Sequence, residues 1–161
     1  MSKLTIFSDG ASKGNPGDAG IGVVITGEDG TVLQEICEYI GKTTNNVAEY
    51  QALIRGLQEA GRLGAEELQI STDSELMARQ LVGVYKVKSK LLKPLHEEAV
   101  ALLRGFGKVR ITHVMREFNK RADRLANEAV KKHRNKTIAG DLDRPEPSTP
   151  AGRPRQKRLD L

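Results

Sequence analysis

The chain has 161 residues and a formal net charge of +5, and its length suits a single domain with a substantial hydrophobic core. One cysteine, Cys37, excludes an internal disulfide, and no apolar run approaches the roughly 20 residues of a transmembrane helix. The chain begins without a signal-like apolar segment, so we expect a cytoplasmic protein. Cys37 lies in an apolar strand pattern and is predicted to be a small buried hydrophobe.

The positive charge is concentrated near the end of the chain. Residues 1–130 hold 17 basic and 17 acidic residues, whereas residues 131–161 hold 9 basic and 4 acidic ones. Net charge alone therefore does not identify a nucleic-acid-binding domain, although a neutral domain can still place an acidic pocket beside a basic flank.

The first predicted strand is short and apolar, with Leu4, Ile6 and Phe7, and Asp9 stands where it should end. Gly10 and the turn Gly14-Asn15-Pro16-Gly17 follow, so the chain reverses direction there. Two interpretations stay open at this point. Asp9 either starts a turn by bonding its own backbone or contributes a carboxylate to a site.

Two more strands, residues 20–26 and 31–40, are predicted to form an antiparallel meander with the first. Residues 43–46 supply capping chemistry for a helix that should end near residue 61 or 64. Its apolar stripe consists of Ala48, Ala52, Leu53, Leu57 and Ala60. Glu49 lies at the edge of this inward face, where an acid needs a helix dipole or a cation to offset its desolvation.

The middle of the chain repeats the pattern of a strand followed by an acid. Residues 68–71 form a short predicted strand, and Asp73 ends it before a helix over residues 75–81. A basic connector over residues 83–93 places Lys86 and Lys88 beside Tyr85, ahead of a helix from about 91 to 103. This connector is either a solvated loop or a binding element.

The last predicted strand covers residues 109–114, and Asn119 should cap a final helix. That helix has an alanine-rich stripe, and Asp123 lies beside it in the first turns. The stripe consists of Ala122, Leu125, Ala126 and Ala129. From about residue 136 the composition changes to Pro, Gly, Ser and charge, so residues 1–135 are predicted to form the domain and residues 136–161 a disordered tail.

This element order predicts an α/β fold with a five-stranded mixed sheet flanked by helices. Strands one to three should be antiparallel, and strands one, four and five parallel, because helical crossovers join parallel neighbours. Ligands in such sheets collect at the carboxyl ends of the strands, where Asp9 and Asp73 fall. Glu49 and Asp123, each early in a helix, can reach the same edge.

Four converging carboxylates raise one another's pKa unless a divalent cation compensates their charge. An oxygen-only ligand set favours Mg²⁺ or Mn²⁺ over zinc. Two such ions can activate a water and stabilise the leaving oxygen of a phosphodiester. Phosphodiester cleavage is therefore the reaction that these groups suit best.

Four motifs together resemble the type 1 ribonuclease H family: Ser8-Asp9-Gly10 with Gly14-Asn15-Pro16-Gly17, then Thr44-Asn45-Asn46-Val47-Ala48-Glu49, then Thr72-Asp73-Ser74, then Asn119-Lys120-Arg121-Ala122-Asp123. The resemblance covers about residues 1–133. It implies that Asp9, Glu49, Asp73 and Asp123 are the metal-binding catalytic carboxylates. The residues expected to bind substrate are Gly10, Asn15, Thr44, Asn46, Glu75, Tyr85, Lys86, Lys88 and Arg116. The implied reaction is hydrolysis of the RNA strand of an RNA–DNA hybrid with two Mg²⁺ ions, Mn²⁺ being the alternative, to give 5′-phosphate products.

Two departures from many bacterial members of this family are visible. The chain has no Trp and only the short connector in place of a long basic insertion, so it resembles the archaeal-like branch, some of whose members also cut double-stranded RNA. The loop before the last acid offers Arg116 where many members have a histidine. His113 is close by, but the alternation of the last strand predicts a structural role for it, with proton transfer as the alternative.

Other functions and partners stay open. A related nuclease or recombinase of the same fold and a noncatalytic hybrid-binding module are the alternatives to a monomeric hybrid-cleaving enzyme. Residues 156–161 end the tail with Leu159 and Leu161 around an acid, a pattern that resembles sequences by which replication and repair proteins hold the sliding clamp. The simpler alternative is that the basic tail adds nonspecific attraction to phosphate.

Overall fold

The computed structural model describes the backbone of residues 2–143 and the side chains of residues 2–137. Its five strands form one sheet in the order β3-β2-β1-β4-β5. They are β1 (Lys3–Gly14), β2 (Gly17–Thr26), β3 (Val32–Thr43), β4 (Glu67–Thr72) and β5 (Lys108–His113). β1, β2 and β3 pair antiparallel, whereas β4 is parallel to both β1 and β5. The predicted α/β fold with a five-stranded mixed sheet is confirmed.

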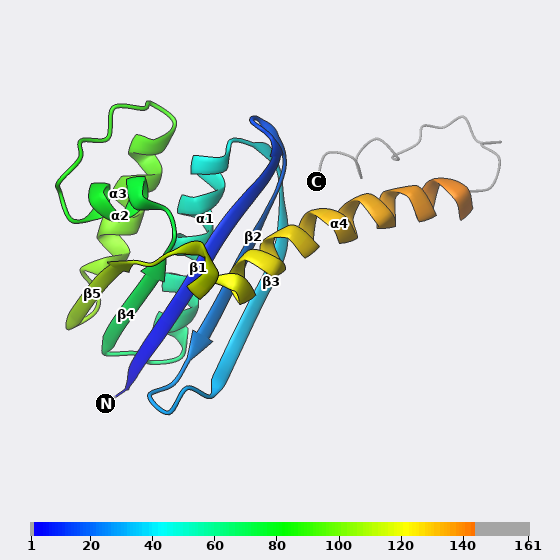
Figure 1. Ribbon diagram of the computed structural model, residues 1–161. Helices are drawn as coiled ribbons and strands as arrows, with labels where there is room; N and C mark the ends of the chain where they lie inside the picture. The colour runs from blue at the N-terminus through cyan, green and yellow to red at the C-terminus, as the bar shows by residue number, and fades with distance from the viewer. Residues whose placement is uncertain (1, 144–161) are drawn as a thin grey trace.

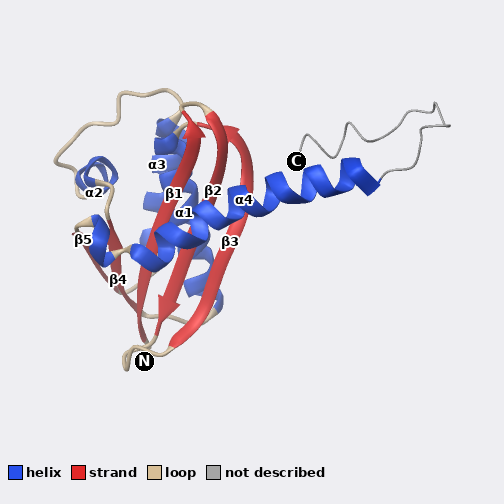
Figure 2. Ribbon diagram, turned by 45° about the vertical axis from the view of Figure 1, so that its right-hand side comes forward, coloured by secondary structure: helices blue, strands red, loops and turns tan. Residues whose placement is uncertain are grey.

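Helices cover both faces of this sheet (Figure 1). α1 (Asn45–Arg62) packs on one face with α3 (Leu92–Leu103) against it, and the short α2 (Glu75–Leu81) follows β4. α4 (Lys120–Asp143) crosses the opposite face and extends past β3 (Figure 2). None of the described helices is long and apolar enough to cross a membrane.

The main core lies between the sheet and α1. Alternate residues of β1, such as Leu4 and Ile6, point toward α1 and meet Leu53 and Leu57 of its predicted stripe. Thr44 begins this helix as its N-cap, and its hydroxyl accepts a hydrogen bond from the Val47 amide at 3.2 Å. The capping predicted from the sequence therefore fixes where α1 starts, and with it the position of the acid in the next turn.

α4 approaches the sheet unusually closely because β2 presents glycines to it. A Cβ atom added to Gly22 would lie 2.1 Å from the Ala122 carbonyl oxygen, so no side chain fits there. Ala122 and Ala126 of the predicted stripe are fully buried on the helix side of the same contact. The first turns of α4 are thus held against the centre of the sheet.

α4 runs further than the composition predicts. The tail is predicted to begin at residue 136, whereas α4 continues to Asp143, eight residues past the predicted end of the domain. Residues 136–143 contain no proline, and the first proline after them is Pro145, so each of these residues keeps the amide that a helix needs. The rest of the predicted tail, residues 144–161, lies outside the described residues.

Candidate active site

The register of β1 and β4 places two acids at one edge of the sheet. β4 ends at Thr72, which pairs with Ser8, so Asp9 and Asp73 each stand one residue beyond the last paired position. The backbone beside Asp9 is therefore free of a strand neighbour on the β4 side.

Glu49 reaches Asp9 because α1 packs very closely on β1. A Cβ atom on Gly10 would lie 2.3 Å from the Ala48 carbonyl carbon, so only glycine permits this approach. The Gly10 amide donates a hydrogen bond to Glu49 Oε1 at 3.2 Å. Gly10, expected to bind substrate, is buried, and its amide is engaged within the protein.

Asp9, Glu49 and Asp73 form a compact triad. Each has an oxygen within 4.8 Å of an oxygen of the others. Asp9 and Glu49 are only 4% and 6% exposed, and Asp73 Oδ2 is a buried acceptor without a hydrogen bond in the described part of the chain. Asp73 Oδ2 has Arg116 Nε at an ion-pair distance of 3.5 Å but makes no hydrogen bond among the described residues, so the oxygen-only cluster fits a hard divalent cation.

Burial and mutual repulsion shift the titration of this triad in the metal-free protein. Desolvation is the largest cause that raises the pKa of Asp9, followed by the charges of Glu49 and Asp73. Desolvation also raises the pKa of Glu49, with the Asp73 charge next, while a hydrogen bond with Asp9 and the Gly10 amide oppose the rise. The folded protein therefore favours protonated carboxyls unless a cation compensates them.

Asp123 approaches the triad from the first turn of α4. Its carboxyl group is hydrogen-bonded to Asp9, whose pKa it helps to raise, but it is not one of the three clustered carboxylates. Asn119, 2% exposed, donates from Nδ2 to the Ser8 carbonyl at 2.9 Å and so ties the start of α4 to β1 beside Asp9. Asn119 was expected to cap α4, and this side chain instead links the helix to the sheet.

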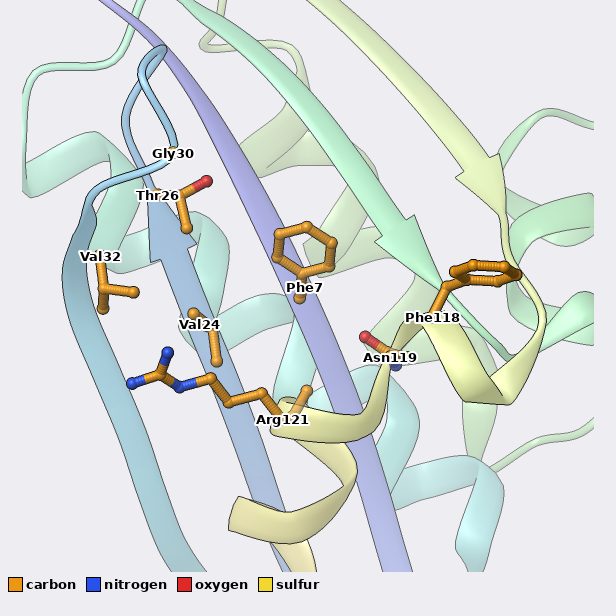
Figure 3. Close-up of a pocket in the computed structure, with 9 residues that line it drawn as sticks. Phe7, Val24, Thr26, Gly30, Val32, Phe118, Asn119 and Arg121 are labelled. Atoms are coloured by element: carbon orange, nitrogen blue, oxygen red, sulfur yellow. The ribbon is translucent and has the colours of Figure 1, made fainter.

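A hollow of about 350 Å³ lies on the α4 face of the sheet, next to Asn119 (Figure 3). Phe7, Val24 and Val32 form its floor, and Phe118 and Arg121 border it from the side of α4. None of the three clustered carboxylates lines it. The hollow is therefore separate from the acidic site, although the two share the start of α4.

The residues expected to bind substrate near the first helix gather around its N-terminus. Asn15 accepts a hydrogen bond from the Asn45 amide at 3.0 Å, which ties the β1–β2 turn to α1. Asn46 is exposed, and the Thr44 hydroxyl is engaged as the helix cap. These residues lie together at the β1–β2 turn and the start of α1, one turn before Glu49 in that helix.

The other expected binding residues lie on α2 and in the connector that follows it. Glu75 forms an ion pair with Arg79 at 2.9 Å, and the Arg79 guanidinium lies over the Tyr85 ring, 5.5 Å from its centre. Tyr85 is 44% exposed, and Lys86 and Lys88 are exposed. The structure therefore joins Glu75 and Tyr85 through Arg79, a residue that the sequence analysis did not single out.

Arg116 and His113 lie on the β5 side of the site. Arg116 Nε is 3.5 Å from Asp73 Oδ2, an ion-pair distance, and the arginine side chain is 79% exposed. His113 ends β5 opposite Thr72, and it is exposed rather than packed in the core. Its place in the strand is as predicted, and both residues stand next to Asp73.

Two residues that the sequence analysis missed connect Asp123 to the β1–β2 hairpin. Asn127 Nδ2 donates to the Asp123 carbonyl at 2.8 Å and to Asp123 Oδ1 at 3.2 Å. The Asn127 amide oxygen accepts a hydrogen bond from Lys13 Nζ. The i, i+4 spacing of Asp123 and Asn127 was available as a signal for the first contact, whereas the contact with Lys13 depends on the tertiary fold.

Cys37 is half-buried rather than fully buried, and its Sγ donates to the Leu125 carbonyl at 3.2 Å. Burial is the main cause that raises the pKa of this thiol. This environment agrees with an inert packing residue and not with a nucleophile.

The first strand was expected to end at Asp9, but β1 continues to Gly14 and pairs with β2 along that length, so Asp9 lies within the strand and only β4 ends beside it. The order of the sheet, α1 and α4 on its opposite faces and the carboxylate triad where β4 ends beside β1 define the class of ribonuclease H-like domains. A family model described as "Reverse transcriptase-like" matches residues 7–129. A bifunctional protein of Mycobacterium tuberculosis is 46% identical over 129 residues, which cover 80% of this chain and 35% of that protein. Ribonuclease HI of Halobacterium salinarum is 44% identical over 128 residues, which cover 80% of this chain and 64% of that protein.

Among solved structures, LC11-RNase H1 from a compost metagenome, in complex with an RNA/DNA hybrid, has a TM-score of 0.77 and 46% identity; the match covers 80% of this chain and 97% of that chain. The chain therefore belongs to the type 1 ribonuclease H family, in its short form without the basic insertion. It spans about a third of the M. tuberculosis protein and about two thirds of the H. salinarum protein.

Proposed function

We propose that this protein is an endoribonuclease that hydrolyses the RNA strand of RNA–DNA hybrids and leaves 5′-phosphate ends. One observation carries the proposal: a buried triad of carboxylates stands at the sheet edge in a chain that is 46% identical to a ribonuclease H solved with an RNA/DNA hybrid. The 2′-hydroxyl distinguishes the RNA strand from DNA, and contacts to backbone and sugar need no base readout. Weak sequence preference follows.

Asp9, Glu49, Asp73 and Asp123 would hold two Mg²⁺ ions, or Mn²⁺ in their place. When bound, these ions supply an activated water and stabilise the leaving oxygen of the phosphodiester. The protein keeps its ligands in place before any ion binds, since the Gly10 amide orients Glu49 and Asn127 orients Asp123. Arg116, near Asp73 and exposed, is available to neutralise charge on the substrate or the product.

The substrate would lie across the triad, between the α1 N-terminus and the connector. Asn15, Asn46 and Glu75 would contact the hybrid near the scissile bond, and Thr44 a phosphate of the DNA strand. In the connector, replacing Lys86 and Lys88 with alanine should weaken hybrid binding. The slope of log affinity against log salt should also become shallower by about one for each lost phosphate contact. An unchanged salt slope would identify the connector as a solvated loop.

Cleavage of labelled duplexes tests the proposed activity directly. An RNA–DNA hybrid would be compared with single-stranded RNA, double-stranded RNA, duplex DNA and branched DNA, each with Mg²⁺, with Mn²⁺ and with chelator. We expect metal-dependent cleavage of the RNA strand in the hybrid. Cleavage of branched DNA instead would identify a recombinase-like nuclease, and binding without cleavage would identify a noncatalytic hybrid-binding module. The double-stranded RNA arm shows whether the substrate range extends beyond hybrids.

Two further proposals concern partners. The triad is built from one chain, which supports action as a monomer, and light scattering would measure the mass in solution. We also propose that Gln156 to Leu161 docks on a sliding clamp, on the basis of the sequence pattern alone, because these residues lie outside the described part of the chain.

A further inference from the structure

A second concave surface opens beside the acidic site, between the end of β1 and the outer side of α4. Its volume is about 530 Å³. The lining residues come from β1 and from successive turns of α4: Lys13, Arg124, Asn127, Glu128, Val130, Lys131, Arg134 and Asn135. We call this surface the α4 groove. Lys131 stands eight residues after Asp123 in the helix, so the two are about 12 Å apart along its axis.

The α4 groove carries uncompensated positive charge. Arg134 is neutralised by Asp18, with Nε 2.9 Å from Oδ2. Arg124 and Lys131 are exposed, and neither has a carboxylate partner among the residues that the structure describes. Glu128 is the acidic side chain in the lining, so the cations outnumber it. Unpaired cations along a concave surface attract a polyanion.

The groove is connected to the acidic site through one side chain. Asn127 donates a hydrogen bond to Asp123 and accepts one from Lys13. A single side chain therefore separates Lys13 from the fourth carboxylate, Asp123. A strand whose reacting phosphate lies at the triad would therefore meet Lys13 first and then the cations of α4. At a rise of about 3 Å per nucleotide, 12 Å corresponds to the next few nucleotides of the duplex.

We propose that the α4 groove binds the sugar-phosphate backbone of the nucleic acid on one side of the scissile phosphate, through Lys13, Arg124 and Lys131. The inference rests on the proposed function for the identity of the duplex. It assigns the chain a phosphate-binding surface on the side of the triad away from the connector. Affinity for the duplex then comes from both flanks of the site rather than from the connector alone.

The test is hybrid binding in chelator, measured by fluorescence anisotropy between 50 and 200 mM salt for the full chain. We expect the triple variant Lys13→Ala, Arg124→Ala, Lys131→Ala to raise Kd about tenfold or more at low salt. The slope of log affinity against log salt should become shallower by up to about three, one for each lost phosphate contact. Thermal melting would establish that the variant is folded.

The matched control is Lys3→Ala, Arg104→Ala, Lys108→Ala, which removes the same number of lysines and arginines. Lys3 and Lys108 begin β1 and β5 at the opposite edge of the sheet, and all three residues are exposed. The control should keep nearly the wild-type slope. Equal weakening in both variants would show a general effect of net charge and overturn the proposal, as would no weakening in the groove variant.

A charge-reversal pair guards against misfolding of the triple variant: Lys131→Glu should weaken binding more than Lys108→Glu. The outcomes also separate the two proposals. Wild-type protein that binds the hybrid through the groove but does not cleave it would retain the α4 groove and reject the proposed activity. Wild-type protein that cleaves, with unchanged binding in the groove variants, would reject the groove alone. Absence of any duplex binding by the wild type would overturn both.

Discussion

Buried acids dominate the site at the scale of single residues. Asp9 and Glu49 are almost wholly removed from water, yet the Gly10 amide is the hydrogen-bond donor that the structure places on Glu49. Burying carboxylates together costs folding free energy and adds nothing to packing. Loss of one of these acids should therefore be measurable in activity, and the cost of burying them should be measurable in the stability of the metal-free protein.

Asp9→Asn and Asp73→Asn should each abolish hydrolysis while the fold is kept. Loss of a hydrogen-bond partner of a metal ligand already costs about 10- to 100-fold, so loss of a ligand should lower kcat by more than about 100-fold. The amide has nearly the volume of the carboxyl group, so circular dichroism should match the wild type, and the metal-free variants should melt no lower than the wild type. His113→Ala is the comparison, and it should cost much less than Asp123→Asn. Near-wild-type rates in the asparagine variants would contradict the assignment.

The metal-free protein should become less stable as pH rises. Because burial raises the folded-state pKa of Asp9 and Glu49, the penalty is absent below about pH 4, where both states are protonated, and grows as pH rises toward the raised pKa values. Urea unfolding in chelator at pH 5 and pH 8 should differ by about 1 kcal/mol or more from this cause.

Two controls isolate these carboxyls from the other titrating groups. Asp9→Asn should reduce the pH dependence, and added Mg²⁺ should restore stability at pH 8, because the ion binds the deprotonated ligands. A pH dependence that is the same in wild type and Asp9→Asn would show that other groups cause it.

At the scale of elements, the contact between α4 and β2 decides where Asp123 lies. Gly22→Ala should push α4 away from the sheet, because the new Cβ would lie 2.1 Å from a backbone oxygen. We expect a loss of about 1–3 kcal/mol in the free energy of unfolding, together with lower activity from the displaced Asp123. Gly27→Ala, whose Cβ would meet only ordinary contacts from 3.5 Å, is the matched control and should change stability by less than about 0.5 kcal/mol.

At the scale of the whole molecule, the folded domain should cleave without the last residues. A protein ending at Asp143 keeps all of α4 that the structure describes, so its kcat should equal that of the full chain, and only substrate affinity should fall if the basic tail attracts phosphate. A loss of kcat would show that residues 144–161 contribute to the site itself.

Clamp docking by the tail makes a different prediction. A tail peptide should bind a sliding clamp in a direct titration, and Leu159→Ala with Leu161→Ala should weaken that binding about tenfold or more, since a buried leucine contributes about 2 kcal/mol. Phosphate attraction would instead ignore the leucines and fall when Arg155 and Lys157 are neutralised. No clamp binding by the peptide would end this hypothesis.

Local chemistry in the sequence determined the elements and the residue types of the site. Apolar residues marked β1, Thr44 marked the start of α1, and the acids stood out because Asp73 follows a strand and Glu49 and Asp123 lie early in helices, whereas Asp9 proved to lie within β1. α4 extends to Asp143, past the boundary that composition suggested, because composition does not fix where a helix ends.

Tertiary structure decided which of these residues meet. The register that sets Ser8 opposite Thr72 and the bare backbone of Gly10 bring Asp9, Glu49 and Asp73 together, whereas Asp123 stays beside the cluster. The link from Lys13 through Asn127 to Asp123 joins residues more than a hundred positions apart, and no local pattern encodes it. Periodicity and capping act within a few residues of the chain. A site is made by close packing between segments that are distant in the sequence, and the spacing between those segments is set only when the whole core assembles.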